Sequence, residues 1–427
     1  MMVFVRPVAR RGCPRRLDRS ASSADHWAMD PVAAQYEAYP YPARDPAEET
    51  RRLLTGTPSD PLEIDHFLFA GRRDWSRPFR ALVAGGGTGD GLVMLAQKLS
   101  DAGCPAEIVY LDLSRAAREI AERRIAARGL SGVTFRTGDL LEAPALGPFD
   151  YIDCCGVLHH LPDPGAGFAA LAEALVEGGG LGAMVYAPYG RTGVYPLQAA
   201  LRALAPEDLS PQERVLRARA ALDALPETNW FRRNHLLGDH LESDAGLFDL
   251  LLHARDRPFA ADEVMAAVEA AGLAFAGFVE PARYAPETWI GEAAAPARGL
   301  PAAERAALGE RLAGGIKTHV FYATKGPPRV AKPGPEARPR LRGERPGPLA
   351  ATVGAGRAAH VRRDGARHRL ELPRASAPAL KLLDGRRRLG EVATALRTDW
   401  VGFSAAFAPL YRTLNGWGML YFSETFE

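Results

Sequence analysis

Short apolar runs and amphipathic stretches alternate through the middle of the chain. Four runs fit buried parallel strands, and they lie at residues 81–84, 106–113, 133–135 and 149–155. Helical spacing of apolar residues follows the first run at 92–99. A second helix is predicted at 165–177, ended by Gly178-Gly179-Gly180, with a fifth strand at 181–186. This alternation predicts an α/β fold built on a mainly parallel sheet.

The segment 188–255 is longer than an ordinary crossover between a strand and the next helix. It contains helical patterns at 196–204 and 212–225. An insertion at this point of a parallel sheet lies above the carboxyl ends of the strands, where ligands bind. We therefore interpret 188–255 as a lid over an acceptor site.

The remaining pattern completes the sheet and adds a second unit. Beyond the insertion we expect a helix at 261–271, a strand at 274–279, a helix at 302–313 and a strand at 319–324. Prolines and arginines dominate 326–348, which predicts an extended, solvated linker. Residues 349–427 then form a small α+β domain, with a hairpin turn at Arg363-Asp364-Gly365, helices at 377–383, 389–396 and 401–414, and a strand at 419–422.

The first 28 residues carry several arginines and little hydrophobic pattern. We expect residues 1–28 to be a basic, poorly ordered extension. The main domain is therefore expected to span 29–325.

Glycines follow the first strand at alternate positions, as Gly85, Gly87 and Gly89. A strand that turns into a helix over glycines leaves bare backbone N–H groups, which a ligand can approach closely. A dinucleotide fingerprint needs a third glycine at the sixth position, but Asp90 stands there, so the spacing disfavours a nicotinamide cofactor. Asp112 ends the second strand about 20 residues past the turn, where a carboxylate accepts both hydroxyls of a ribose.

The glycine turn and the elements after it resemble the class I S-adenosylmethionine (SAM) methyltransferases. Gly-x-Gly-x-Gly resembles motif I of that family, and Leu158-His159-His160-Leu161 resembles its loop after the fourth strand. The resemblance implies a seven-stranded Rossmann-like sheet of order 3-2-1-4-5-7-6 with an antiparallel last strand. It also implies SAM as cofactor, S-adenosylhomocysteine as product, and no metal.

In the family that this chain resembles, the residue matching Asp139 hydrogen-bonds the adenine amino group and the residue matching Leu140 packs on the ring. The resemblance and the glycine turn together assign ten residues to cofactor binding: Gly85, Gly86, Gly87, Gly89, Asp90, Asp112, Leu113, Asp139, Leu140 and Cys155.

One position departs from the family pattern. Many members carry an acidic residue two positions before the first glycine, where it helps to hold the methionine end of the cofactor. This chain has Val83 there. Asp90, just past the glycines, is a candidate to hold the ammonium group instead.

Candidate residues on the acceptor side come from three segments. His159 and His160 border the expected pocket, and imidazole titrates near neutral pH, so either is a candidate general base. The alternative is that one of them packs against or caps the following helix.

Tyr36, Tyr39 and Tyr41 belong to a region whose Tyr-Pro-Tyr-Pro sequence resembles a segment before motif I in a group of bacterial methyltransferases. This segment is either a flap over the pocket or an arm packed on the sheet edge. Trp230, in the insertion, is a further candidate contact to substrate.

The resemblance implies in-line transfer of the SAM methyl group to an acceptor. Protein or peptide, RNA and small-molecule acceptors are all compatible with the sequence. Two alternatives stay open: a SAM-binding regulator without turnover that signals through its C-terminal module, and a Rossmann enzyme that uses a nicotinamide. In that module, residues 382–392 resemble winged-helix peptide-binding modules of the PqqD type, which implies a peptide or protein partner.

The composition of the chain indicates where the protein is located more clearly than what reaction it catalyses. The formal net charge of +2 gives no bulk attraction to nucleic acid. The four cysteines have no C-x-x-C spacing, so neither a zinc site nor a disulfide framework is indicated. No apolar stretch reaches the length of a membrane span, so we expect a cytoplasmic protein without a membrane partner.

Overall fold

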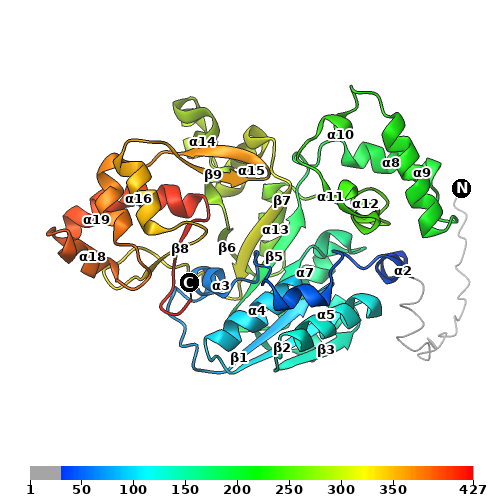
Figure 1. The fold of residues 1–427 in the computed structure, drawn as a ribbon, viewed down its shortest axis with the longest axis horizontal. Coiled ribbons are helices and arrows are strands. Elements are labelled where there is room, and N and C mark those ends of the chain that lie inside the picture. The colour runs from blue at the N-terminus through cyan, green and yellow to red at the C-terminus, as the bar shows by residue number, and fades with distance from the viewer. Residues whose placement is uncertain (1–29, 427) are drawn as a thin grey trace, which may run out of the picture.

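A seven-stranded sheet forms the centre of the computed structural model, which describes residues 30–426 (Figure 1). The prediction for residues 1–28 lies outside the described residues. The sheet order β3-β2-β1-β4-β5-β7-β6 confirms the expected order. Strand β7 is antiparallel to both β5 and β6, and the other pairings are parallel, as expected. The strands are β1 (Phe79–Ala84), β2 (Ala106–Asp112), β3 (Val133–Thr137), β4 (Phe149–Cys155), β5 (Leu175–Tyr186), β6 (Ala274–Phe278) and β7 (Thr318–Thr324).

Helices cover both faces of the sheet because alternate residues of a buried strand point to opposite sides. In β1, Ala81 and Val83 belong to one apolar cluster, whereas Leu82 and Ala84 belong to the other. One face is covered by α3 (Pro61–Leu68), α4 (Asp90–Asp101) and α5 (Arg115–Ala127). The other is covered by α6 (Ala143–Leu146), α7 (Pro164–Glu173), α13 (Ala261–Ala270) and α15 (Ala302–Ala313).

The three glycines predicted to end a helix lie inside β5 instead. Helix α7 already ends at Glu173, and the register of β5 against β4 shifts between Phe149 and Tyr151, next to the glycines. A Cβ at Gly180 would lie 2.5 Å from a methyl group of Leu68 in α3. The close packing of α3 on the sheet, not a helix end, therefore requires glycine at this position.

The insertion forms a small helical core of its own. It contains α8 (Val194–Leu204), α9 (Pro211–Ala224), α10 (Trp230–Arg233), α11 (Asp239–Glu242) and α12 (Asp244–Leu251). Figure 1 shows this insertion in green on one side of the sheet and the C-terminal residues in orange to red on the other. Helix α2 (Pro31–Ala38) precedes the first strand and reaches toward the insertion.

The segment 326–348 is not the solvated linker that its composition predicted. Ala331 and Ala337 are buried in the apolar core of the C-terminal unit, and β8 (Pro339–Leu341) pairs with β11 (Leu420–Phe422). Arg342 of this segment forms an ion pair with the buried Glu63 of α3. Because its small side chains fill a core and Arg342 has an acidic partner, the segment is part of the C-terminal unit.

The rest of the C-terminal unit follows the predicted order. The hairpin of β9 (Ala359–Arg363) and β10 (Ala366–Leu370) turns at Asp364 and Gly365, both with positive φ. Its helices are α16 (Pro346–Gly354), which the sequence pattern did not predict, and the predicted α17 (Ala377–Lys381), α18 (Leu389–Ala395) and α19 (Trp400–Gly416). The short helix α14 (Pro286–Ile290) lies within the sheet domain along the chain, between β6 and α15. Within residues 30–426, none of the helices combines the length and the apolar character that crossing a membrane requires.

Candidate functional site

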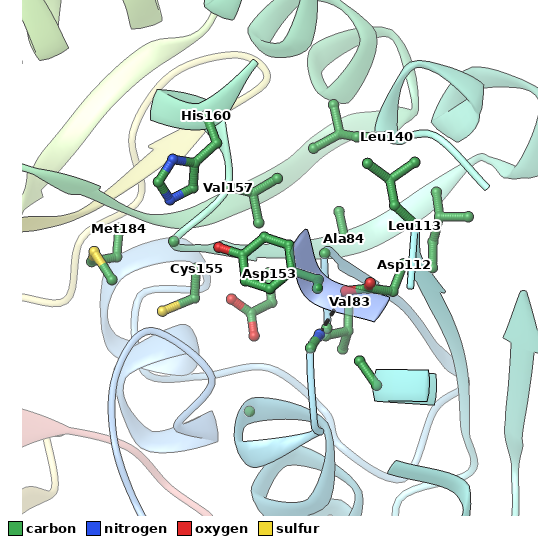
Figure 2. Close-up of a pocket in the computed structure, with 18 of the residues that line it drawn as sticks. Val83, Ala84, Asp112, Leu113, Leu140, Asp153, Cys155, Val157, His160 and Met184 are labelled. Atoms are coloured by element: carbon green, nitrogen blue, oxygen red, sulfur yellow. Dashed lines mark hydrogen bonds between the residues drawn. The ribbon is translucent and has the colours of Figure 1, made fainter. Parts of the chain in front are cut away.

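A cavity of about 860 Å³ opens at the carboxyl ends of β1, β2 and β4 (Figure 2). All ten residues expected to bind a cofactor line this cavity, although they come from four separate stretches of the chain. His160, Tyr36 and Tyr41 also line it. His159, Tyr39 and Trp230 do not. The sequence therefore located the cavity, while its candidates on the acceptor side divide into two groups.

The glycine turn brings bare backbone to the edge of the cavity. Gly85, Gly87 and Gly89 have φ values of +71°, +51° and +98°, in the region that favours glycine. A Cβ at Gly85 would lie 2.2 Å from Val157, and one at Gly86 would lie 2.3 Å from the ring of Tyr110. Both backbone conformation and packing thus require glycine here, and the turn leaves room for a ligand against the start of α4.

Asp112, at the end of β2, is held by the glycine turn. Its Oδ2 accepts a hydrogen bond from the Gly87 N–H at 2.7 Å, and its Oδ1 accepts one from the Ser114 N–H at 2.8 Å (Figure 2). Burial raises the pKa of Asp112 to about 6. Each carboxylate oxygen keeps a further lone pair, so the group can still accept hydrogen bonds from a ligand in the cavity.

The third strand end supplies Asp139 and Leu140. Asp139 caps a short 3-10 helix, because its Oδ1 accepts a hydrogen bond from the Leu141 N–H at 2.7 Å. Leu140 is buried, and Figure 2 shows it with Leu113 and Asp112 on the same side of the cavity. This side therefore offers an apolar surface for a flat ring next to two carboxylates.

Asp90 is not free to hold an ammonium group. Its carboxylate forms ion pairs with Arg44 and Arg124, each at 2.6 Å. Although burial acts in the opposite direction, the hydrogen bonds and charges of these arginines hold the pKa of Asp90 below its usual value. Asp90 thus joins the N-terminal segment to α5, and its negative charge is already compensated.

The two neighbouring histidines occupy different environments. His159 is buried outside the cavity, with its ring centroid 3.9 Å from that of Tyr186 and no hydrogen-bond partner for either ring nitrogen. His160 lines the cavity, and its Nδ1 donates a hydrogen bond to the Arg255 carbonyl oxygen at 2.7 Å. That bond places the proton on Nδ1, so Nε2 keeps its lone pair. Burial lowers the pKa of His160, so the ring is neutral near pH 7.

Asp249 in α12 lines the cavity and was missed by the sequence analysis. Its Oδ1 accepts a hydrogen bond from the Tyr36 hydroxyl at 2.9 Å, and its Oδ2 accepts one from the Tyr186 hydroxyl at 3.1 Å. Burial raises the pKa of Asp249. The helical pattern of α12 gave no signal for Asp249, because the sequence does not show which face of a helix in the insertion meets the sheet.

His160, Asp249 and His253 have side-chain ligand atoms within 4.8 Å of one another, which is a spacing that suits a metal ion. However, His253 Nδ1 accepts a hydrogen bond from the Arg255 N–H at 3.0 Å, which leaves its proton on Nε2, 3.2 Å from the Tyr36 hydroxyl. A protonated nitrogen is not a metal ligand. In this arrangement, the cluster is a hydrogen-bond network beside the His160 Nε2 lone pair.

The predicted flap residues lie in three places. Tyr36 belongs to α2, not to an extended stretch, and it reaches the cavity together with Tyr41. Tyr39 packs on Phe248 of the insertion, with ring centroids 5.3 Å apart. Trp230 is 67% exposed and does not line the cavity. Aromatic character alone thus did not distinguish cavity, packing and surface positions.

Comparisons with known proteins agree with this geometry. Residues 82–181, from β1 into β5, match the family described as a methyltransferase domain. An uncharacterized protein from Synechococcus sp. is 32% identical over 270 residues, which cover 61% of this chain and 62% of that protein. The structure of PKMT2 from Rickettsia typhi in complex with AdoHcy aligns with a TM-score of 0.57 at 15% identity, over 82% of this chain and 72% of that one. Residues 82–181 are therefore similar in sequence to methyltransferase domains, and the fold is that of a Rossmann-like methyltransferase.

Proposed function

We propose that the protein transfers a methyl group from SAM to an acceptor. The observation that carries this proposal is the convergence of three strand ends on one cavity, which brings together the glycine turn, Asp112, and Asp139 with Leu140. The match to a methyltransferase domain family supports it, and so does the AdoHcy bound to the structurally similar PKMT2. The fit also agrees, because Gly85, Gly86 and Gly87 line the cavity without side chains, which lets a ligand approach the backbone of the turn.

The residues of the cavity divide between the parts of this cofactor. Asp112 accepts hydrogen bonds from the ribose hydroxyls while the Gly87 and Ser114 N–H groups hold its carboxylate in place. Asp139 and Leu140 contact the adenine. When bound, SAM supplies a methyl group on a sulfonium, which is already activated for displacement. The protein therefore has to align the acceptor and remove its proton where it has one.

The acceptor side is built from His160, Asp249 and the tyrosines that bond to it. The acceptor lone pair would form a bond to the methyl carbon while the bond from that carbon to the sulfonium sulfur breaks and its electron pair goes to the sulfur. The proton of the acceptor would pass to the His160 Nε2, which has a free lone pair. The bond from Nδ1 to the Arg255 carbonyl oxygen holds the ring and stabilises the charge that it gains. Asp249 fixes the hydroxyls of Tyr36 and Tyr186 around the acceptor. The insertion that carries Asp249 acts as the acceptor lid, and a protein or peptide, an RNA or a small molecule remains a candidate acceptor.

Substitution of Asp112 tests the proposal. We expect the wild-type chain to transfer label from methyl-tritiated SAM to a component of a bacterial cell extract. Asp112→Ala should weaken SAM binding about 10²–10⁴-fold, because it removes two charge-assisted hydrogen bonds of about 1.5–3 kcal/mol each. Glu107→Ala is the matched control, because Glu107 is an exposed residue of the same strand.

The outcomes separate the three classes of function. Binding of SAM with no labelled product would contradict turnover and indicate a regulator. Heat from NADH and none from SAM would contradict the cofactor assignment. Sizing the labelled product identifies the acceptor class.

A further inference from the structure

Many class I methyltransferases carry an acidic residue in β1, two positions before the first glycine of the turn. This chain has Val83 at that position and therefore lacks that carboxylate. Asp90, the nearest acidic residue along the chain, is engaged by two arginines. The cavity nevertheless contains a carboxylate beside Val83, on the neighbouring strand. Val83 and Asp153 are direct partners in the parallel pairing of β1 with β4.

Asp153 points to the same face of the sheet as Val83, because side chains of paired residues in neighbouring strands share a face. It lines the cavity, and Figure 2 shows its carboxylate among the side chains there, between Cys155 and Val83. The residue is only 2% exposed. Strand β4 therefore contributes a carboxylate to the lining of the cavity.

The hydrogen bonds of Asp153 are incomplete. Its Oδ2 accepts a hydrogen bond from the Ser59 hydroxyl, while its buried Oδ1 has no partner. Among the carboxylates that line the cavity in the described part of the chain, Asp153 is the one with a buried oxygen lacking a partner. A buried polar atom without a partner is costly, so its position in a ligand cavity indicates that a ligand donates to it.

We propose that Asp153 binds the ammonium group of the methionine part of SAM and S-adenosylhomocysteine, in place of the acidic residue absent at Val83. This inference rests on the proposed function. An ammonium group offers three N–H donors and a positive charge, which match an unpaired carboxylate oxygen in a cavity of low dielectric constant. The carboxylate of this chain therefore lies on β4 instead of β1, on the same face of the sheet and directly beside the position that is acidic in the family pattern.

Burial raises the pKa of Asp153 to about 7, with the Ser59 hydroxyl acting in the opposite direction. An ammonium group beside the carboxylate stabilises its ionised form and lowers that pKa.

The loop that carries Ser59, the hydrogen-bond partner of Asp153, is held in place against the sheet. The hydroxyl of Tyr151 bonds to the Pro58 carbonyl oxygen on the loop that also carries Ser59, so the loop is fixed against β4. The site is therefore built before the ligand arrives.

The test is a thermodynamic cycle in which calorimetric titration measures the affinity of two ligands for the wild-type chain and for Asp153→Asn. The ligands are S-adenosylhomocysteine and its deaminated analogue, which lacks the amino group and keeps every other atom of the skeleton. For the wild-type chain, we expect the analogue to bind about 30-fold more weakly, as for the loss of a charge-assisted hydrogen bond. For Asp153→Asn, we expect both ligands to bind with the same, reduced affinity.

Two controls make the result specific. 5′-Methylthioadenosine, which lacks the whole amino acid part, should bind Asp153→Asn within about threefold of wild type, which also reports that the variant is folded. Asp163→Asn changes another carboxylate at the rim of the cavity, an exposed residue that caps α7, and should keep the 30-fold preference.

Equal binding of the two main ligands by the wild-type chain would overturn the assignment of Asp153, and this measurement does not depend on any variant. An unchanged preference in Asp153→Asn would overturn it as well. In both cases the proposed function would stand, because the ligands still bind. If the wild-type chain bound none of the three adenosyl compounds, the proposed function itself would fail.

Discussion

We expect a chain that ends at Lys325 to lose its cooperative unfolding transition and its affinity for SAM. All eight residues of α3 are buried, and each of its polar side chains, Glu63, Asp65 and His66, has a partner in the C-terminal unit. The Ser423 hydroxyl donates to Asp65 Oδ2 at 2.6 Å, and the Phe422 N–H donates to His66 Nδ1 at 3.1 Å. Arg342 forms an ion pair with Glu63. Removal of residues 326–427 deletes all of these partners.

The effect should reach the cavity because α3 begins directly after the loop that borders it. Gly56, Thr57 and Ser59 line the cavity, and Arg342 Nη2 donates to the Gly56 carbonyl oxygen at 3.2 Å. A buried charge that loses its partner costs about 3–5 kcal/mol, which is a large part of the stability of a typical domain. The C-terminal unit is thus part of the folded catalytic domain, in addition to any partner it binds.

Thermal unfolding followed by circular dichroism, together with calorimetric titration of SAM, measures this effect. In the full chain, Arg342→Ala should reproduce part of the loss, lowering the free energy of unfolding by about 3 kcal/mol, at the lower end of that range because the Arg342 side chain is 27% exposed. Arg369→Ala is the matched control in the same unit. Its exposed pair with Glu371 should contribute less than about 1 kcal/mol. A shortened chain with a wild-type transition and unchanged SAM affinity would contradict this account of α3.

His160→Gln should lower the rate of methyl transfer by about 10²–10⁴-fold and leave SAM affinity within a few-fold of wild type. The substitution removes the proposed general base, because a glutamine side chain has no group that can take up the proton of the acceptor. The rate is that of label transfer from tritiated SAM into the extract fraction that the wild-type chain labels. His159→Gln is the matched control, because His159 lies outside the cavity. We expect it to keep the wild-type rate within a few-fold. Equal losses in the two variants would argue against a role for His160 as base.

The pH profile gives an independent test of the same residue. A base acts when it is deprotonated, and burial lowers the pKa of His160 below the usual imidazole value of about 6.5. At saturating SAM, where the bound ammonium group keeps Asp153 ionised, the rate should therefore stay constant from pH 8 to 7 and fall only below about pH 6.5. Asp249 and Asp256 oppose this shift, while Arg191 adds to it. A rate that falls already between pH 8 and 7 in the wild-type chain would show that a different group controls the acidic limb.

The sequence predicted the sheet and its strand order, and it brought together the ten candidate residues that line one cavity. These features depend on local patterns: short apolar runs specify strands, and glycine at positions 85, 87 and 89 specifies a turn that other residues cannot form. Strand order then follows from the resemblance, and strand order places Asp112 and Asp139 beside the turn. No long-range contact has to be known for this step.

The acceptor side and the C-terminal unit depend on contacts that local patterns do not encode. Asp249 belongs to a lid helix whose orientation is set by packing against α2 and β5, not by its own sequence. The composition of 326–348 suggested a solvated spacer because proline and arginine are common in linkers. The partner of Arg342, however, lies in α3, far away along the chain. Asp153 stood in a predicted buried strand, but its proposed role follows from its pairing with Val83 and from its buried Oδ1, which has no partner in the cavity.

The most direct test of the central claim is a crystal structure of the chain with S-adenosylhomocysteine. The account predicts the ribose hydroxyls at Asp112, the adenine against Leu140, and the ammonium group at Asp153. A complex in which the nucleoside lies elsewhere, with the glycine turn and Asp112 making no contact to it, would contradict the account.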